Sequence, residues 1–204
     1  MNLAQLQQEV YALTNRPDLV PETLSAIKAA TLKCHHSDFF YKDLQTAQLT
    51  LATADFTNQF DTAALLRYRA MSYIRKWYPT GVSVQTLLPT GKPGSFLTPI
   101  STDEVLDSYQ RDRNNVYYIA GTTVQLKTHD QLATFLCSWY AHPSIDIANF
   151  QSFIAVEHPY AVVYEAAGAV FKMIGYDEQS TRYSALSAEQ LQMLKMSNIE
   201  VQAR

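Results

Sequence analysis

The sequence is poor in cysteine and in charge, and it has no long apolar run. Its 204 residues include two cysteines, Cys34 and Cys137, which stand far apart and in no ligand or redox spacing. This pattern argues against a disulfide framework and predicts two buried free thiols. No apolar stretch reaches the roughly 18 residues of a membrane span, and the N-terminus lacks the pattern of a signal peptide. We therefore expect a soluble protein that is made in a reducing cytoplasm and has no membrane partner.

A basic excess is also missing. The net charge is −3, and charged residues make up 17% of the chain. Proteins that bind nucleic acid on their own normally carry a surplus of lysine and arginine, so the composition argues against that class. A channel through which DNA slides is compatible with mild acidity, because sliding requires few strong contacts.

Motifs for catalysis and for cofactor binding are lacking as well. The segment 90–95 contains a Gly-Lys pair, but Pro93 stands where a phosphate-binding loop needs Ser or Thr, and proline removes a backbone N–H. No Gly-x-Ser-x-Gly is present. His35 and His36, with Asp38, come closest to a metal group, but adjacent helical side chains point about 100° apart. We predict no enzyme, no cofactor and no metal site.

Aromatic residues, by contrast, are abundant. Thirteen tyrosines, nine phenylalanines and two tryptophans make up 12% of the chain. Tyrosine and tryptophan suit surfaces that are apolar yet partly wet, as at subunit interfaces. A tyrosine-rich core explains the same composition, and both interpretations stay open.

Helix signals gather at both ends of the chain. Asn2 can cap a first helix, and Pro21 opens a second that runs to about His35. Near the C-terminus Pro159 precedes an apolar helix over residues 160–174, and Gly175 suits its end. This helix is apolar on nearly all faces, so we expect close packing at Gly168 and help from a neighbouring copy.

The middle of the chain has a different pattern. Alternating and β-branched segments predict strands near residues 45–52, 57–60, 68–77 and 133–140, and a hairpin over 115–127. Residues 79–99 are rich in proline and glycine and predict a long exposed loop. The predicted fold is α+β, with a bundle of N- and C-terminal helices and a β-rich insertion. Its predicted segments are 1–38, 39–150, 151–198 and a tail over 199–204.

Two features of the predicted elements suggest contact surfaces. Glu165 is an acid within the apolar helix, which needs a cationic partner such as Arg67, Arg75, Lys172 or a neighbour's arginine, unless it lies on an exposed edge. The strand that starts near Arg67 mixes arginine with aromatics. It fits a stacking platform for nucleic acid, a solvated charged face over an aromatic core face, or a subunit contact.

The last quarter of the chain carries a family likeness. Phe153-Ile154, the Glu157-His-Pro159 start, the run 161–167 (Ala-Val-Val-Tyr-Glu-Ala-Ala) and the Gly-Tyr-Asp-Glu turn at 175–178 follow one another. Upstream, residues 117–121 (Tyr-Tyr-Ile-Ala-Gly) and 139–143 (Trp-Tyr-Ala-His-Pro) fit the same layout. In this order the chain resembles the head-to-tail adaptor (connector) proteins of short-tailed double-stranded DNA bacteriophages.

The resemblance implies a structural virion protein at the head–tail junction. It implies a homo-oligomeric ring, twelve-fold in this family, that contacts the portal protein and the tail or nozzle protein and lets DNA pass without sequence-specific binding. Extended terminal segments in this family dock on the portal, whereas ordinary fraying is the alternative for the tail. The candidate subunit and portal contacts are Arg67, Tyr68, Arg69, Tyr73, Trp77, Glu165, Gly168, Ile199, Val201 and Arg204. Two other interpretations stay open: a tube, nozzle or completion protein of the tail, and a small cytoplasmic ligand-binding protein or enzyme.

Overall fold

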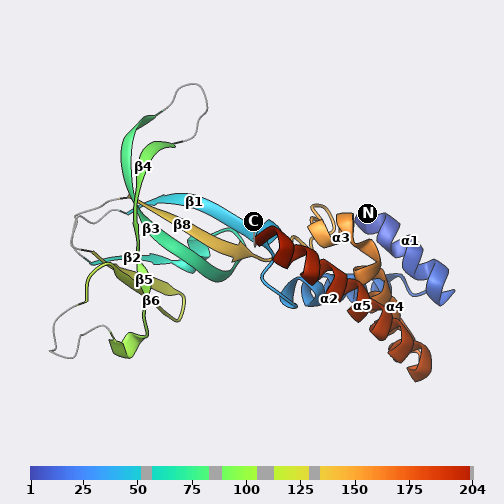
Figure 1. Cartoon of the computed structure of the whole chain (residues 1–204). Helices are drawn as coiled ribbons and strands as arrows, with labels where there is room; N and C mark the ends of the chain where they lie inside the picture. Colours follow the sequence, from blue (N-terminus) through green and yellow to red (C-terminus); the bar gives the residue numbers. More distant parts are fainter. Residues whose placement is uncertain (52–56, 83–88, 105–112, 129–133, 203–204) are drawn as a thin grey trace. The chain divides into compact units, whose positions relative to one another are not determined.

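The computed structural model describes residues 1–51, 57–82, 89–104, 113–128 and 134–202. Its contacts divide the chain into two compact units (Figure 1). The helical unit joins Met1–Asp43 with His142–Arg204, and the β unit is Leu44–Ala141. The chain therefore leaves the helical unit after Asp43 and returns to it at His142.

Local signals set the ends of the helices. Asn2 and Gln5 form a capping box at the start of α1, a proline opens α2 and another opens α4, and the Ser152 side chain caps α3. Gly175 has φ of 83°, the left-handed conformation that favours glycine just after a helix. The helices are α1 (Leu3–Thr14), α2 (Val20–His36), α3 (Phe153–Glu157), α4 (Pro159–Met173) and α5 (Asp177–Gln202).

Helix α4 is the centre of the helical unit. Ala161, Val162, Ala166 and Val170 are fully buried, and α1, α2, α3 and α5 all pack against α4. At Gly168 an added Cβ would lie 3.2 Å from the Ser180 carbonyl oxygen, so the glycine permits a close approach of α5. Helices of the same chain thus cover α4, and the expected help from a neighbouring copy is not needed.

The β unit contains two four-stranded sheets. One has the order β1-β8-β3-β4 and the other β2-β7-β6-β5, antiparallel throughout except for the β5–β6 pair. A core of side chains from both sheets lies between them, including Ile74 and Phe135 from the first and Val124 and Leu126 from the second. The strands are β1 (Leu44–Thr50), β2 (Thr57–Asp61), β3 (Tyr68–Val82), β4 (Pro89–Phe96), β5 (Thr98–Pro99), β6 (Val116–Ala120), β7 (Thr123–Lys127) and β8 (Thr134–Ala141).

The predicted architecture of a helical bundle with a β-rich insertion is wrong. The described chain is a mixed α+β protein with five helices and eight strands in two sheets, and its helices do not form a clear bundle. They gather round α4 instead, while α1 and α2 have little contact with each other. The reason is that α4 is apolar on nearly every side, so each of the other helices gains most by covering it.

The predicted loop over residues 79–99 also needs correction. Strand β3 continues to Val82, and strand β4 begins at Pro89. The two strands pair with each other, with Pro79 opposite Gly91 and Trp77 opposite Pro93. Strand β4 is at the edge of its sheet, where a proline's missing N–H costs no ladder bond. Residues 83–88 lie outside the described residues.

Two shorter segments differ from expectation. The sequence of residues 102–107 (Thr-Asp-Glu-Val-Leu-Asp) predicts a short capped helix. The structure describes a 3-10 turn at Thr102–Glu104, and residues 105–107 lie outside the description. The tail predicted from residue 199 is helical as far as Gln202, because α5 continues through Asn198 without a break. Asn198 is buried there, so it serves a purpose other than ending a helix.

The close approach at Gly168 predicts sensitivity to added volume. Gly168→Val should lower the free energy of unfolding of the helical unit by about 1–3 kcal/mol, since the new side chain meets the backbone of α5. Urea unfolding followed by helical circular dichroism measures this loss. Ala185→Val, at an exposed position of α5, should cost about 0.5 kcal/mol. Equal losses in the two variants would contradict the close approach.

Candidate functional site

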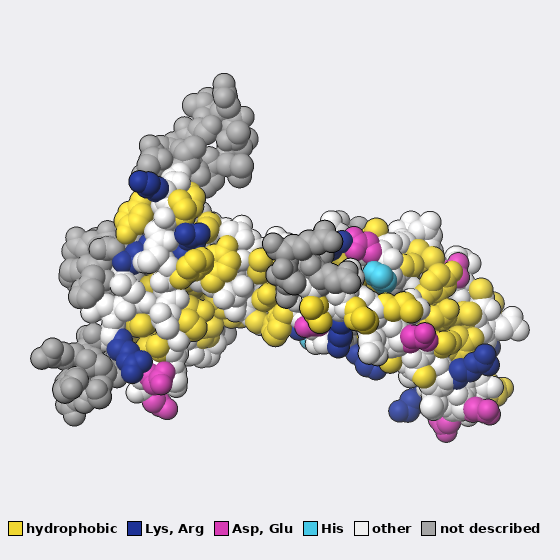
Figure 2. Space-filling view, in the orientation of Figure 1, with side chains coloured by type: hydrophobic (Ala, Val, Ile, Leu, Met, Phe, Trp, Pro, Cys, Tyr) yellow, Lys and Arg dark blue, Asp and Glu magenta, His cyan; other side chains and the backbone are white. Residues whose placement is uncertain are grey.

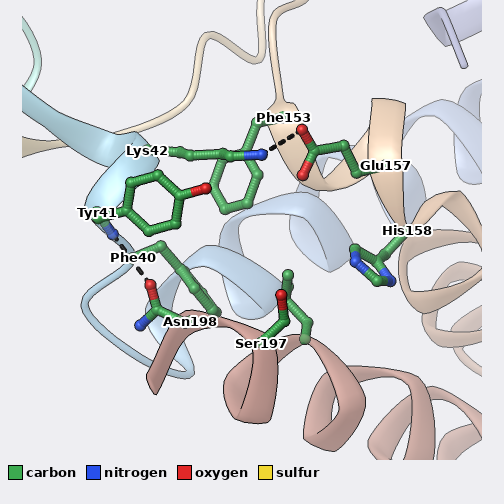
Figure 3. Close-up of a pocket in the computed structure, with 9 residues that line it drawn as sticks. Phe40, Tyr41, Lys42, Phe153, Glu157, His158, Ser197 and Asn198 are labelled. Atoms are coloured by element: carbon green, nitrogen blue, oxygen red, sulfur yellow. Dashed lines mark hydrogen bonds and ion pairs between the residues drawn. The ribbon is translucent and has the colours of Figure 1, made fainter. Parts of the chain in front are cut away.

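The candidate site of the helical unit lies near Asp43, where the chain passes from the helical unit to the β unit. The segment 40–42, α3 and the C-terminal part of α5 meet around a small cavity of about 30 Å³ (Figure 3). That volume holds one or two water molecules and excludes any substrate of metabolite size. The cavity is lined by Phe40, Tyr41, Lys42, Phe153, Glu157, His158, Leu194, Ser197 and Asn198.

Asn198 holds α5 to the segment that leads out of the helical unit. Its Oδ1 accepts from the Tyr41 backbone N–H at 3.2 Å (Figure 3). Its Nδ2 donates to the Phe39 carbonyl oxygen, also at 3.2 Å. One buried amide thus pairs with both a backbone donor and a backbone acceptor of the segment that leads out of the helical unit. No local pattern predicts this role, because the contacts join residues 157 and 159 positions apart in the chain.

Lys42 ties the same segment to α3. Its ammonium forms an ion pair with Glu157 and lies 5.6 Å from the centre of the Tyr41 ring and 5.9 Å from that of Phe153. The hydrogen bond to Glu157 raises the pKa of Lys42 above its ordinary value. The pair is partly open to solvent, so it orients the segment more than it stabilises the fold.

A buried hydrogen-bond chain lies behind Phe153. His35 Nδ1 is 2.8 Å from Asp43 Oδ2, and His35 Nε2 is 2.9 Å from Ser152 Oγ. A carboxylate can only accept, so Nδ1 carries the proton, and Ser152 Oγ accepts from the Ala155 backbone N–H at 3.1 Å. We call these three side chains, His35, Asp43 and Ser152, the His35 relay.

The His35 relay has the residue types and the order of contacts of a Ser-His-Asp triad. Its three side chains are nevertheless buried, with His35 only 1% exposed, and Phe153 closes over the imidazole edge-on at 5.1 Å. The Ser152 hydroxyl is already engaged as the cap of α3. Because every member is used inside the helical unit, we interpret the relay as a structural link between α2, the exit at Asp43 and the start of α3.

Glu165 has a partner that the sequence did not suggest. Its carboxylate is 2.6 Å from Lys33 Nζ on α2, and its side chain is 16% exposed. The described ion-pair partner is therefore none of those predicted from the sequence. Glu165 and Gly168 line one open groove, together with Lys33, Lys172 and the first turns of α5.

Several exposed apolar side chains lie on the outward side of the C-terminal part of α5. Ala188, Gln192, Met196 and Ile199 recur at three- and four-residue spacing and line a shallow groove along the helix. Met196 is 61% exposed and Ile199 62% exposed, and Met193 beside them is 52% exposed. Figure 2 shows hydrophobic side chains gathered over the helical unit. We call Met193, Met196 and Ile199 the α5 face.

A second surface of mixed character lies on the β3–β4 hairpin. The Arg75 guanidinium donates to the Gly94 carbonyl oxygen and lies 4.6 Å from the centre of the Phe96 ring, which also meets Tyr73 edge-on. Phe96 is 57% exposed and Tyr78 41% exposed. Lys and Arg side chains stand among hydrophobic ones in this region (Figure 2). We call Arg75, Tyr78 and Phe96 the hairpin face.

The candidate contact residues do not form one patch. Five are half-buried along the start and length of β3, two lie on α4, and Ile199 is on the α5 face. Val201 is within α5, but its side chain is outside the description, as is the whole of Arg204. The β3 group is Arg67, Tyr68, Arg69, Tyr73 and Trp77, and the α4 group is Glu165 and Gly168.

Comparison with other proteins adds no family to this geometry, because no protein-family model and no curated protein matches the chain. None of the helices among the described residues combines the length and the apolar character that a membrane span requires.

Removing one hydroxyl tests the His35 relay. Ser152→Ala should lower the free energy of unfolding of the helical unit by about 1–3 kcal/mol, since it removes a helix cap and leaves a buried His35 nitrogen without its partner. Ser197→Ala, at an exposed position of α5, should change it by less than about 0.5 kcal/mol. Chemical denaturation measures both, and indistinguishable values would show that the relay contributes nothing.

The two thiols report on each unit separately. Burial raises the pKa of Cys34 in the helical unit and of Cys137 in the β unit to about 12. At pH 8 both stay protonated, so a disulfide reagent should label neither in the native protein and both in denaturant. Mass spectrometry assigns the labelled cysteine. Rapid labelling of one native thiol would mean that its unit opens readily.

Proposed function

We propose that this chain is a structural virion protein, a head-to-tail adaptor that forms a ring between the portal and the tail. The sequence resemblance supplies this identity as a hypothesis. The observation that carries it furthest is the α5 face, since Met196 and Ile199 are 61% and 62% exposed on a long helix. Exposed apolar groups that recur along one helix are typical of a protein contact.

The chemistry of the α5 face suits a contact between proteins. Methionine side chains are flexible and polarisable, so a methionine-rich surface adapts to the shape of its partner. The face includes no ionised group, and removing it from water carries no charge-desolvation cost. Lys195 borders it, as a polar rim borders the apolar centre of an interface.

A ring needs a second, different surface. Closed rings of more than two subunits use heterologous contacts, in which one patch meets another of different structure. The hairpin face offers such a patch, because it combines an arginine with aromatic side chains, the residue types enriched at the centre of interfaces. The α5 face and the hairpin face therefore supply two chemically distinct surfaces on one chain.

The partners follow from the proposal. They are the portal protein, the tail or nozzle protein and further copies of the chain, twelve in the family that the sequence resembles. DNA would pass through the ring without sequence-specific binding, in keeping with a net charge of −3. The protein would reside in the virion, at the head–tail junction, after synthesis in the bacterial host.

Electron microscopy of the chain mixed with the portal of the same genome tests the adaptor proposal. The expected result is a stacked ring on the tail-facing side of the portal, and its symmetry gives the copy number. Met196→Glu should reduce ring occupancy at least tenfold, because it places a charge in a desolvated contact. Gln179→Glu adds the same charge at an exposed position in the first turns of α5 and should assemble like the unaltered chain.

The other outcomes separate the alternatives. Binding to tail rings but not to the portal would make the protein a tube, nozzle or completion protein. Binding to neither would refute a role at the junction and favour a small ligand-binding protein. Full assembly of Met196→Glu would leave the adaptor in place but remove the α5 face as its contact.

A further inference from the structure

The histidine next to His35 takes part in a second contact. His36 and His142 bring their rings together, with His36 Nε2 3.1 Å from His142 Nδ1 and the ring centres 5.0 Å apart. The two residues are 106 positions apart in the chain, at the end of α2 and at the return from the β unit. The pair is open to solvent, because His36 is exposed and His142 half-exposed.

The separation of the two nitrogens fits a shared metal ion. Zinc binds imidazole nitrogen at about 2.0–2.1 Å, so two nitrogens 3.1 Å apart subtend about 100° at an ion placed between them. That angle lies between the right angle of square or octahedral coordination and the larger tetrahedral angle. Adjacent histidines on one helix cannot achieve this arrangement, and His35 in fact turns inward to its relay while His36 turns to His142.

The backbone on both sides is fixed before any ion arrives. Ser37 ends α2, donating from its backbone N–H and from its hydroxyl to the Cys34 carbonyl oxygen. On the other side Ser144 and Gln151 exchange two backbone hydrogen bonds, at 3.0 and 2.9 Å, which close the segment that follows His142. Ligands held in this way lose little conformational freedom on binding.

We propose that His36 and His142 form a surface site for a divalent transition-metal ion such as Zn²⁺, Ni²⁺ or Cu²⁺. Neutral imidazole suits these ions and not Mg²⁺ or Ca²⁺, which prefer oxygen. Within the described residues no group of three or more His, Cys, Asp or Glu side chains could hold a metal, so water or a group from another molecule completes the coordination. The proposal does not depend on the adaptor function.

Calorimetric titration of Zn²⁺ into the full, metal-stripped chain without an affinity tag tests the site. We expect one ion per chain, with an affinity at least about tenfold lower in both His36→Gln and His142→Gln. His158→Gln removes a histidine of the same unit and should leave the affinity unchanged. Unfolding curves without metal show whether each variant is folded.

Histidine ring signals in NMR spectra give a readout that does not depend on variants. Addition of Zn²⁺ should shift the ring signals of His36 and His142 and leave those of His35 and His158 in place. Absence of heat with the unaltered chain, test variants that bind Zn²⁺ as tightly as the unaltered chain, or shifts confined to other histidines would each overturn the proposal. The contact would then be an imidazole–imidazole hydrogen bond alone.

Discussion

The His35 relay is the interaction on which the helical unit depends. His35 closes the last turn of α2, Asp43 is the last residue before the chain departs, and Ser152 starts α3 on the way back to α4. A buried imidazole with both nitrogens satisfied fixes the separation of these three segments, since any shift would leave a polar atom unpaired in the core. Asn198 and Lys42 then position the exit segment against α5 and α3.

The interior of the helical unit is packed separately from the exposed apolar side chains on its surface. Most apolar groups of α4 are buried within the chain, so the exposed methionines of α5 are not left over from an incomplete core. On the hairpin face, the Arg75 side chain is held in place by the Gly94 carbonyl oxygen and the Phe96 ring. It is therefore oriented before any partner binds. The hairpin face is thus pre-organised, which lowers the cost of association.

Sequence reasoning succeeded where a signal is local and failed where a contact is distant. Pro159 and Gly175 mark the two ends of α4 because each restricts its own backbone, and the structure confirms both boundaries. The partner of Glu165 is Lys33, 132 residues away, and no spacing rule reaches that far. Prolines misled the prediction for residues 79–99, because their effect differs between a loop and an edge strand. The His35 relay could not be predicted from the sequence. Ser152 has the pattern of an ordinary helix cap, and Asp43 that of an ordinary acidic residue in a turn.

The division of the helical unit by the β unit has a consequence for biogenesis. The core of that unit needs α4, yet roughly 100 residues of β unit are translated between α2 and the segment that leads to α4. Translation proceeds at about 5–20 residues per second. The apolar sides of α1 and α2 are therefore without their partner α4 for on the order of 5–20 seconds while the ribosome synthesises the β unit. The β unit is complete in sequence by then and can fold first. The N-terminal helices therefore gain their main packing partner only after the whole β unit has been synthesised.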